Sequence, residues 1–266
     1  MFVILFFVGA YFEDAYRKKE LPHFFKASGV LALAAVVGVC INISNLYHTY
    51  EYSKETMRGK SELKQEGAAA SQTSSGLDRD YITNWSYGIG ETLTLLVPNV
   101  KGGGSGSTMS QSEAAMAKAN PMYNGIYSQL PQYFGEQPWT AGPVYVGAFV
   151  MFLFVLGCFI VKGPLKWALL GATIFSILLS WGKNFMGLTD FFIDYVPMYN
   201  KFRAVSSILV IAEFTIPLLA IFALKEILSK PDMLKQEKNC RGVIAALVLT
   251  AGVAFILAVA PGAFFS

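Results

Sequence analysis

The stretch AVSSILVIAEFTIPLLAIFAL, residues 204–224, decides the fold class, because Glu213 is its only charged residue. A helix that spans a bilayer needs roughly 20 mostly apolar residues. Four more uncharged stretches are long enough to enter or cross a bilayer, and a shorter apolar run precedes them at residues 1–12. These stretches cover residues 27–47, 137–161, 167–182 and 242–266. The sequence therefore predicts an all-α membrane protein with about six transmembrane helices, the first of them incomplete.

Composition supports the same class. The chain has 266 residues, of which 54% are hydrophobic and 15% are charged, whereas soluble domains carry about 25% charged residues. The cysteines and histidines form no CxxC motif and no cluster, which argues against a disulfide framework or a zinc site. We expect no cofactor. The first apolar run is short and the last has no polar tail, so we expect a piece of a longer membrane protein.

Basic residues predict the orientation in the membrane. Short loops rich in Lys and Arg stay in the cytoplasm. Such residues gather in the loops 13–22, 162–166 and 225–241, which alternate with the apolar stretches. All three loops can therefore be cytoplasmic at once. This arrangement places residues 48–136 and 183–203 outside the cytoplasm, as an extracytoplasmic loop domain and an extracytoplasmic helix.

The long outer loop divides by composition. Residues 49–66 are charged and are predicted to extend the preceding helix outward. Residues 67–76 and 101–107 are rich in glycine and small polar residues, which is typical of flexible linkers. A capping box at residues 110–113 predicts a helix over residues 111–119.

Aromatic side chains are dense in this loop. They are Tyr81, Trp85, Tyr87, Tyr123, Tyr127, Tyr133, Phe134 and Trp139. Tyrosine and tryptophan suit the membrane interface, and their flat faces equally suit sugar rings. Asp78 and Asp80 flank Arg79, and alternate carboxylates can share a divalent cation. We expect interface anchoring without a metal, and sugar binding and a divalent cation at Asp78 and Asp80 are the alternatives.

The second outer segment has the pattern of an amphipathic helix. Its apolar residues recur at helical spacing. They are Leu188, Phe191, Phe192, Tyr195 and Val196. Asp190 and Asp194 lie four residues apart and point away from this stripe together. The pattern predicts a helix lying flat on the outer membrane face, begun by a cap at Thr189 or Asp190 and ended by Pro197. The two carboxylates would face water, or a cavity where they bind substrate.

Cations surround this predicted helix. Lys183 precedes it, and the string PMYNKFR after it contains Tyr199, Lys201 and Arg203. Arginine binds phosphate through a planar two-pronged fork, and lysine adds a point charge. The segment therefore fits a phosphate site. The alternative is that the long cationic side chains reach lipid headgroups.

Glu213 is the single charge within a predicted span. An ionised carboxylate near the bilayer midplane is costly, so it needs a partner, a cavity or a proton. We expect Glu213 to face the helix bundle and make a hydrogen bond between helices. A proton or substrate pathway is the alternative.

Several strings, taken in order, resemble the bacterial YfhO-like membrane protein family, particularly members from Bacteroides-type bacteria. The strings are NLYHTYEY at 45–52, TNWSYG at 83–88 continuing to Glu91 and Pro98, YFGEQP at 133–138, GPVY at 142–145, WGKN at 181–184 and PMYNKFR at 197–203. The resemblance extends over roughly residues 1–225.

This resemblance implies a GT-C-like fold in the bacterial inner membrane, crossing it several times. It implies an enzyme that takes sugar from a polyprenyl-phosphate-linked donor to envelope glycopolymers, with membrane lipid and no nucleic acid as partners. The catalytic carboxylate of such enzymes usually lies in the first outer loop, which here would precede Met1. We expect substrate-binding residues on the outer side. They are Arg203, Lys201, Lys183, Tyr199, Asp190, Asp194, Trp85, Tyr87, Glu91 and Glu136.

Two other functions remain open. One is a transporter or flippase-like protein with Glu213 in a polar pathway, and the other is a non-catalytic subunit for envelope assembly. The long outer loop favours work outside the cytoplasm, because functional residues concentrate in long loops on rigid scaffolds.

Overall fold

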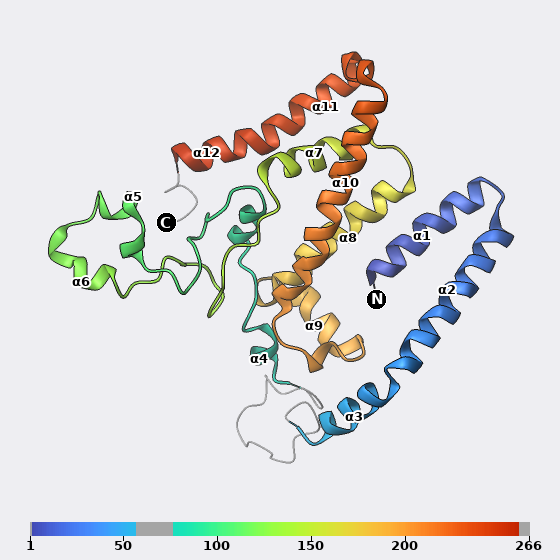
Figure 1. The fold of residues 1–266 in the computed structure, drawn as a ribbon, viewed down its shortest axis with the longest axis horizontal. Helices are drawn as coiled ribbons and strands as arrows, with labels where there is room; N and C mark the ends of the chain where they lie inside the picture. Colours follow the sequence, from blue (N-terminus) through green and yellow to red (C-terminus); the bar gives the residue numbers. More distant parts are fainter. Residues whose placement is uncertain (1, 57–76, 261–266) are drawn as a thin grey trace.

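The computed structural model describes residues 2–56 and 77–260 (Figure 1). Over these residues the chain is all-helical, as predicted, and its few bridges belong to no strand. The helices are α1 (Phe2–Arg17), α2 (Leu21–Ile41), α3 (Ile43–Lys54), α4 (Arg79–Thr83), α5 (Glu113–Met116), α6 (Asn124–Tyr127), α7 (Ala148–Ile160), α8 (Pro164–Ser180), α9 (Met186–Tyr195), α10 (Val210–Ser229), α11 (Glu237–Leu247) and α12 (Val253–Val259).

Three helices in the described parts of the chain are long and apolar enough to cross a membrane. They span Leu21–Ile41, Val205–Ser229 and Glu237–Val259. The pair Pro164–Ser180 and Gly182–Tyr195 is a fourth candidate, bent by 110° at its break. These lengths are those expected of a membrane protein.

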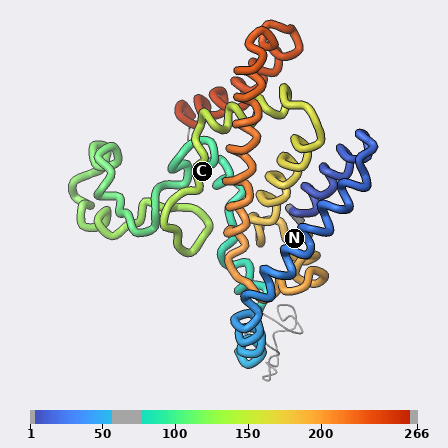
Figure 2. Tube along the Cα trace, turned by 45° about the vertical axis from the view of Figure 1, so that its right-hand side comes forward, coloured from blue at the N-terminus to red at the C-terminus, as the bar shows by residue number. Residues whose placement is uncertain are grey.

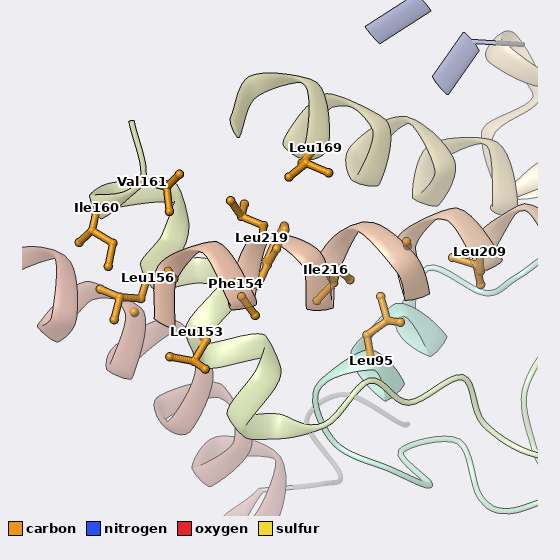
Figure 3. Close-up of a cluster of buried hydrophobic side chains, with 14 of the residues drawn as sticks. Leu95, Leu153, Phe154, Leu156, Ile160, Val161, Leu169, Leu209, Ile216 and Leu219 are labelled. Atoms are coloured by element: carbon orange, nitrogen blue, oxygen red, sulfur yellow. The ribbon is translucent and has the colours of Figure 1, made fainter. Parts of the chain in front are cut away.

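The core lies where α7, α8 and α10 pack together (Figure 3). Leu156, Leu169, Ile216 and Leu219 are almost completely buried there. The close approach of α7 to α10 depends on Gly157, because a Cβ at this position would lie 3.2 Å from the Leu219 backbone oxygen. These contacts fix α10 in the centre of the molecule.

Polar and aromatic contacts add to this core. The hydroxyl groups of Thr173 in α8 and Thr215 in α10 are 2.7 Å apart, so each satisfies the other inside the bundle. On the other side of α8, α1 packs through Phe6 and Phe175, whose ring centroids are 6.0 Å apart. The bundle therefore joins the start of the chain to its second half.

The α2–α3 segment stands away from the bundle (Figures 1 and 2). Neither helix contains a buried residue. The loop predicted over residues 13–22 is shorter, because α1 continues to Arg17 and α2 begins at Leu21. The charged helical extension is confirmed as far as Lys54 in α3. Residues 55 and 56 lie beyond the end of α3, and the remainder of the predicted extension, with the linker predicted at 67–76, falls outside the described residues.

The predicted span 137–161 is wrong in its first half. Helix α7 begins only at Ala148, and its 13 residues extend about 20 Å at 1.5 Å per residue. Pro138 and Pro143 disfavour helix in the residues before them. Gly147 has a φ of +102°, which an L-residue side chain rarely adopts. The apolar composition of this segment therefore does not make a helix.

The glycine-rich stretch 101–107 is not a flexible linker. The backbone N–H of Ser105 donates to the Thr140 carbonyl at 2.8 Å. A Cβ at Gly102 would lie 1.8 Å from the Gln132 carbonyl oxygen, so only glycine fits there. The glycines allow two backbone segments to approach closely, and the predicted flexibility is wrong.

The helix predicted over 111–119 is also shorter. Ser112, not Ser110, caps α5, because its Oγ accepts from the Ala115 N–H at 3.4 Å. The segment of α5 and α6 projects away from the helix bundle (Figure 1), and neither helix has a buried residue. Short helices without tertiary packing are marginal, which explains the single turn of α5.

Candidate functional site

The polar residues of the two segments predicted to lie outside the cytoplasm gather where α8 bends into α9. Gly182 makes the bend with a φ of +45°, and a Cβ there would lie 2.1 Å from Ser86 Oγ. The Lys183 N–H donates to Ser86 Oγ at 2.8 Å, and the Tyr87 N–H donates to the Ser180 carbonyl at 2.8 Å. The segment after α4 is therefore fixed on the bend by backbone hydrogen bonds and a glycine contact.

Arg203 lies beside two aromatic rings, that of Tyr81 in α4 and that of Trp85 in the segment after it. Its Nη1 donates to the Tyr81 hydroxyl at 2.8 Å. Its guanidinium carbon lies 5.1 Å from the centroid of the Trp85 ring and 5.5 Å from that of Tyr81. A guanidinium over an aromatic face is held by electrostatic attraction. In the described part of the chain no carboxylate forms an ion pair with Arg203, which is exposed.

Trp85 is positioned from two sides. Its indole N–H donates to the Trp139 carbonyl at 3.3 Å, and its own carbonyl accepts from the Ser206 N–H at 3.2 Å. Ser206 belongs to η6 (Val205–Leu209), the turn that leads into α10. The ring beside Arg203 is therefore tied to both segments, and Trp85 and Arg203, two of the predicted substrate-binding residues, lie together.

Arg79 has different partners. Its Nη2 donates to Asp194 at 2.6 Å, and its Nη1 contacts Asp190. The hydrogen bond to Asp194 is the main reason that the pKa of Arg79 is raised. We predicted that both aspartates face water or a cavity, and the structure engages both in this ion pair. Asp78 is also occupied, because its side chain caps α4 by accepting from the Asp80 N–H at 2.9 Å.

The amphipathic pattern of α9 is only partly correct. The helix begins at Met186, before the predicted cap. Phe192 is 3% exposed and is buried together with Thr189 and Ile193, whereas Phe191 is 52% exposed. Thr189 does not cap, because its hydroxyl donates to the Gly182 carbonyl at 2.8 Å. One narrow face of α9 is therefore packed. The other two aromatic residues of the predicted stripe, Phe191 and Tyr195, are exposed.

Lys183 and Glu136 form a second polar group on the same bend. The Lys183 ammonium is 3.8 Å from Glu136 Oε2, and the Asn184 side-chain amide donates to that oxygen at 2.8 Å. The positive charge of Lys183 is thus balanced within the protein. Lys183 does not offer the free cation that Arg203 offers.

Glu91 is enclosed within the segment that follows α4. It is only 2% exposed, and it accepts from the Gly88 N–H at 2.6 Å and from the Tyr133 hydroxyl. Burial and the hydrogen bond to Glu91 raise the pKa of Tyr133. The cavity beside Glu91 has a volume of about 10 Å³, whereas ligand pockets measure about 300–1,000 Å³. Glu91 therefore lies in no space that could hold a sugar.

Two predicted site tyrosines are packing residues. Tyr87 is buried with its hydroxyl against Thr94. Burial, with smaller contributions from Glu91 and Glu213, raises its pKa to about 12. Burial likewise raises the pKa of Tyr199 to about 12. The Tyr199 ring lies edge-on to Phe192 with centroids 5.4 Å apart. Lys201 ends the same turn and is half-buried.

Glu213 contradicts its prediction. It lies exposed in the first turn of α10, and it makes no hydrogen bond or ion pair with any described residue. The buried face of α10 instead presents Ala212, Thr215 and Ile216 to the bundle. The expected hydrogen bond between helices is made by Thr215. The prediction that Glu213 faces the bundle is wrong.

The sequence indicated several of the residues in this region but not the side chains that they contact. It found Arg203 and Trp85 but not the hydroxyl of Tyr81, and it considered Asp78 and Asp80 rather than Arg79 between them. The spacing of Asp190 and Asp194 was a usable signal, because carboxylates on one helix face favour a shared cation. In the described ranges no group of three or more His, Cys, Asp or Glu residues could hold a metal ion.

No protein-family model, curated protein or solved structure matches this chain. A functional proposal therefore depends on the geometry around Arg203 and on the sequence motifs described above.

Proposed function

We propose that this chain is the membrane-embedded portion of a glycosyltransferase-like protein that uses a polyprenyl-phosphate-linked sugar. It would act on envelope glycopolymers at the outer side of the bacterial inner membrane. The observation that carries the proposal is Arg203, an exposed guanidinium fixed by two aromatic rings and paired with no described carboxylate. Such a group can hold two oxygens of a phosphate at once.

The proposal includes the arrangement in the membrane. About six spans place the basic connections at residues 18–20, 162–166 and 230–236 in the cytoplasm. The bend at Gly182 then lies at the outer interface, and α9 lies along it with Phe191 and Tyr195 toward lipid. A lipid phosphate of the outer leaflet would meet Arg203 at this depth. The exposed Trp139, whose backbone carbonyl accepts from the Trp85 indole, offers a flat face for the attached sugar.

Orientation is tested by labelling. Cys40, Cys158 and Cys240 are first replaced by alanine, and single cysteines are then placed at Ser105 and Asp232. An impermeant thiol reagent should label the first in intact cells and the second only after the membrane is opened. Labelling of both from the same side contradicts the arrangement.

Function is tested in membranes that lack the native protein. With a polyprenyl-phosphate-linked sugar donor, Arg203→Ala should lose nearly all sugar transfer by the complete protein, and Arg203→Lys should lose much of it. Lysine does not substitute fully because it lacks the planar fork. The matched control is Arg79→Lys, which changes an arginine of the same region that already has two carboxylate partners.

The outcomes separate the alternatives. Wild-type transfer by both Arg203 variants, at equal expression, would show that Arg203 only contacts headgroups and would end the phosphate proposal. Binding of the donor without transfer in the wild-type complete protein would favour the flippase-like or assembly roles.

A further inference from the structure

One face of α10 carries an apolar seam that no described residue covers. Its members recur every three or four residues and lie along one side of the helix. They are Val210, Phe214, Ile221, Leu224 and Leu228, with the half-buried Pro217 between Phe214 and Ile221. The exposed fractions of the large side chains range from 39% at Leu224 to 71% at Leu228. The opposite face of α10 is packed against α7 and α8.

Glu213 lies along one edge of this seam. It is three residues after Val210, next to Phe214, and four residues before Pro217, so it shares the seam's outer turns. Its carboxylate is exposed and unpaired among the described residues. The seam is therefore an apolar surface with one uncompensated negative charge.

The depth of Glu213 makes the missing partner significant. The apolar span begins at Val205, and eight residues at 1.5 Å each place Glu213 about 12 Å inside it. The hydrocarbon of a bilayer is about 30 Å thick. A short carboxylate side chain at this depth does not reach water, so it either takes up a proton or pairs with a cation.

We propose that this seam docks a further membrane-spanning helix that carries a lysine or arginine at the depth of Glu213. Charge complementarity selects this partner, because lipid chains supply no cation there. A second copy of this chain meeting the seam through the same face would place two Glu213 carboxylates side by side, which is repulsive while both are ionised. The proposal concerns α10 alone and does not depend on the proposed sugar transfer.

The test uses model peptides in phosphatidylcholine vesicles. The full chain keeps Cys240, which is exposed, as its single dye site, and Cys40 and Cys158 are replaced by alanine. Leucine-rich peptides of about 20 residues carry one lysine, one leucine or one glutamate at the matching depth. Energy transfer between chain and peptide then reports association.

We expect half-maximal energy transfer at about a tenfold lower mole fraction of the lysine peptide than of the leucine peptide. Glu213→Gln should remove this preference. Glu226→Gln should keep it, since Glu226 is the same residue type at the other end of α10. Helix content by circular dichroism verifies that each variant is folded.

Two outcomes would overturn the proposal. Equal association of all three peptides shows that the seam faces lipid. Association of chains with one another without peptide, lost in Glu213→Gln, shows that a second copy occupies the seam.

Discussion

Arg79 and Arg203 lie in the same region, near the bend between α8 and α9, but their neighbours differ in charge. Arg79 ties α4 to α9 through two aspartates. Arg203 contacts a tyrosine hydroxyl and two aromatic rings, which orient its guanidinium without neutralising it. One arginine therefore connects two elements, and the other remains able to bind an anion. Both residues are arginines, so residue type does not distinguish the two roles. The side chains that each arginine contacts do.

The largest expected effect comes from breaking the bend that supports both arginines. Gly182→Ala should lower the free energy of unfolding by about 2–4 kcal/mol, because its Cβ would overlap Ser86 Oγ and the backbone has a positive φ. Thermal unfolding in detergent measures this. Gly187→Ala is the control, since a Cβ there meets no atom within 4 Å. Equal stability of the two variants would contradict the importance of the bend.

The next effect separates the two arginines directly. Arg79→Met should lower the free energy of unfolding by about 1–2 kcal/mol, because it leaves two carboxylates without their cation; their partial exposure to solvent limits the loss. Arg203→Met should change it by less than about 0.5 kcal/mol, since no charged partner is left behind. Chemical denaturation of both variants gives the comparison. A larger loss of stability for Arg203→Met than for Arg79→Met would show that Arg203, and not Arg79, has the structural role.

A smaller effect concerns the aromatic support of Arg203. Trp85→Leu should weaken binding of polyprenyl phosphate in vesicles about threefold, because a cation–π contact at an exposed site contributes about 0.5–1 kcal/mol. Trp167→Leu is the matched control, because Lys166 lies over that ring at 4.7 Å, far along α8 from the bend. Equal weakening by both variants would point to a general effect on lipid contact.

The smallest effect at neutral pH concerns Tyr199, whose ring packs against Phe192 in α9. The pKa of Tyr199 is raised to about 12 from its ordinary value near 10, so the folded protein holds this proton more tightly than the unfolded chain. Its stabilising contribution is complete below pH 10 and is lost as the pH rises through 12. Tyr199→Phe should flatten the decline in stability over that interval. An unchanged decline would show that Tyr199 ionises as an exposed tyrosine does.

The sequence by itself determined the helical class, because long uncharged runs are compatible with few other structures. It also singled out Arg203 and Trp85, since cationic and aromatic residues crowd the two segments predicted to lie outside the cytoplasm, and the structure brings these two side chains together. It failed at residues 137–147, where prolines and Gly147 prevent the helix that the apolar composition indicates.

Only the tertiary structure decided which charges are free. Asp190 and Asp194 have the spacing of a pair that could bind a ligand, but Arg79, distant in sequence, occupies both. Glu213 has the sequence context of a buried polar link, but Thr215 makes that link with Thr173 and leaves Glu213 on the bare face of α10. Periodicity determines which residues share a helix face. Which face is covered, and by which charge, depends on contacts between segments far apart in the chain.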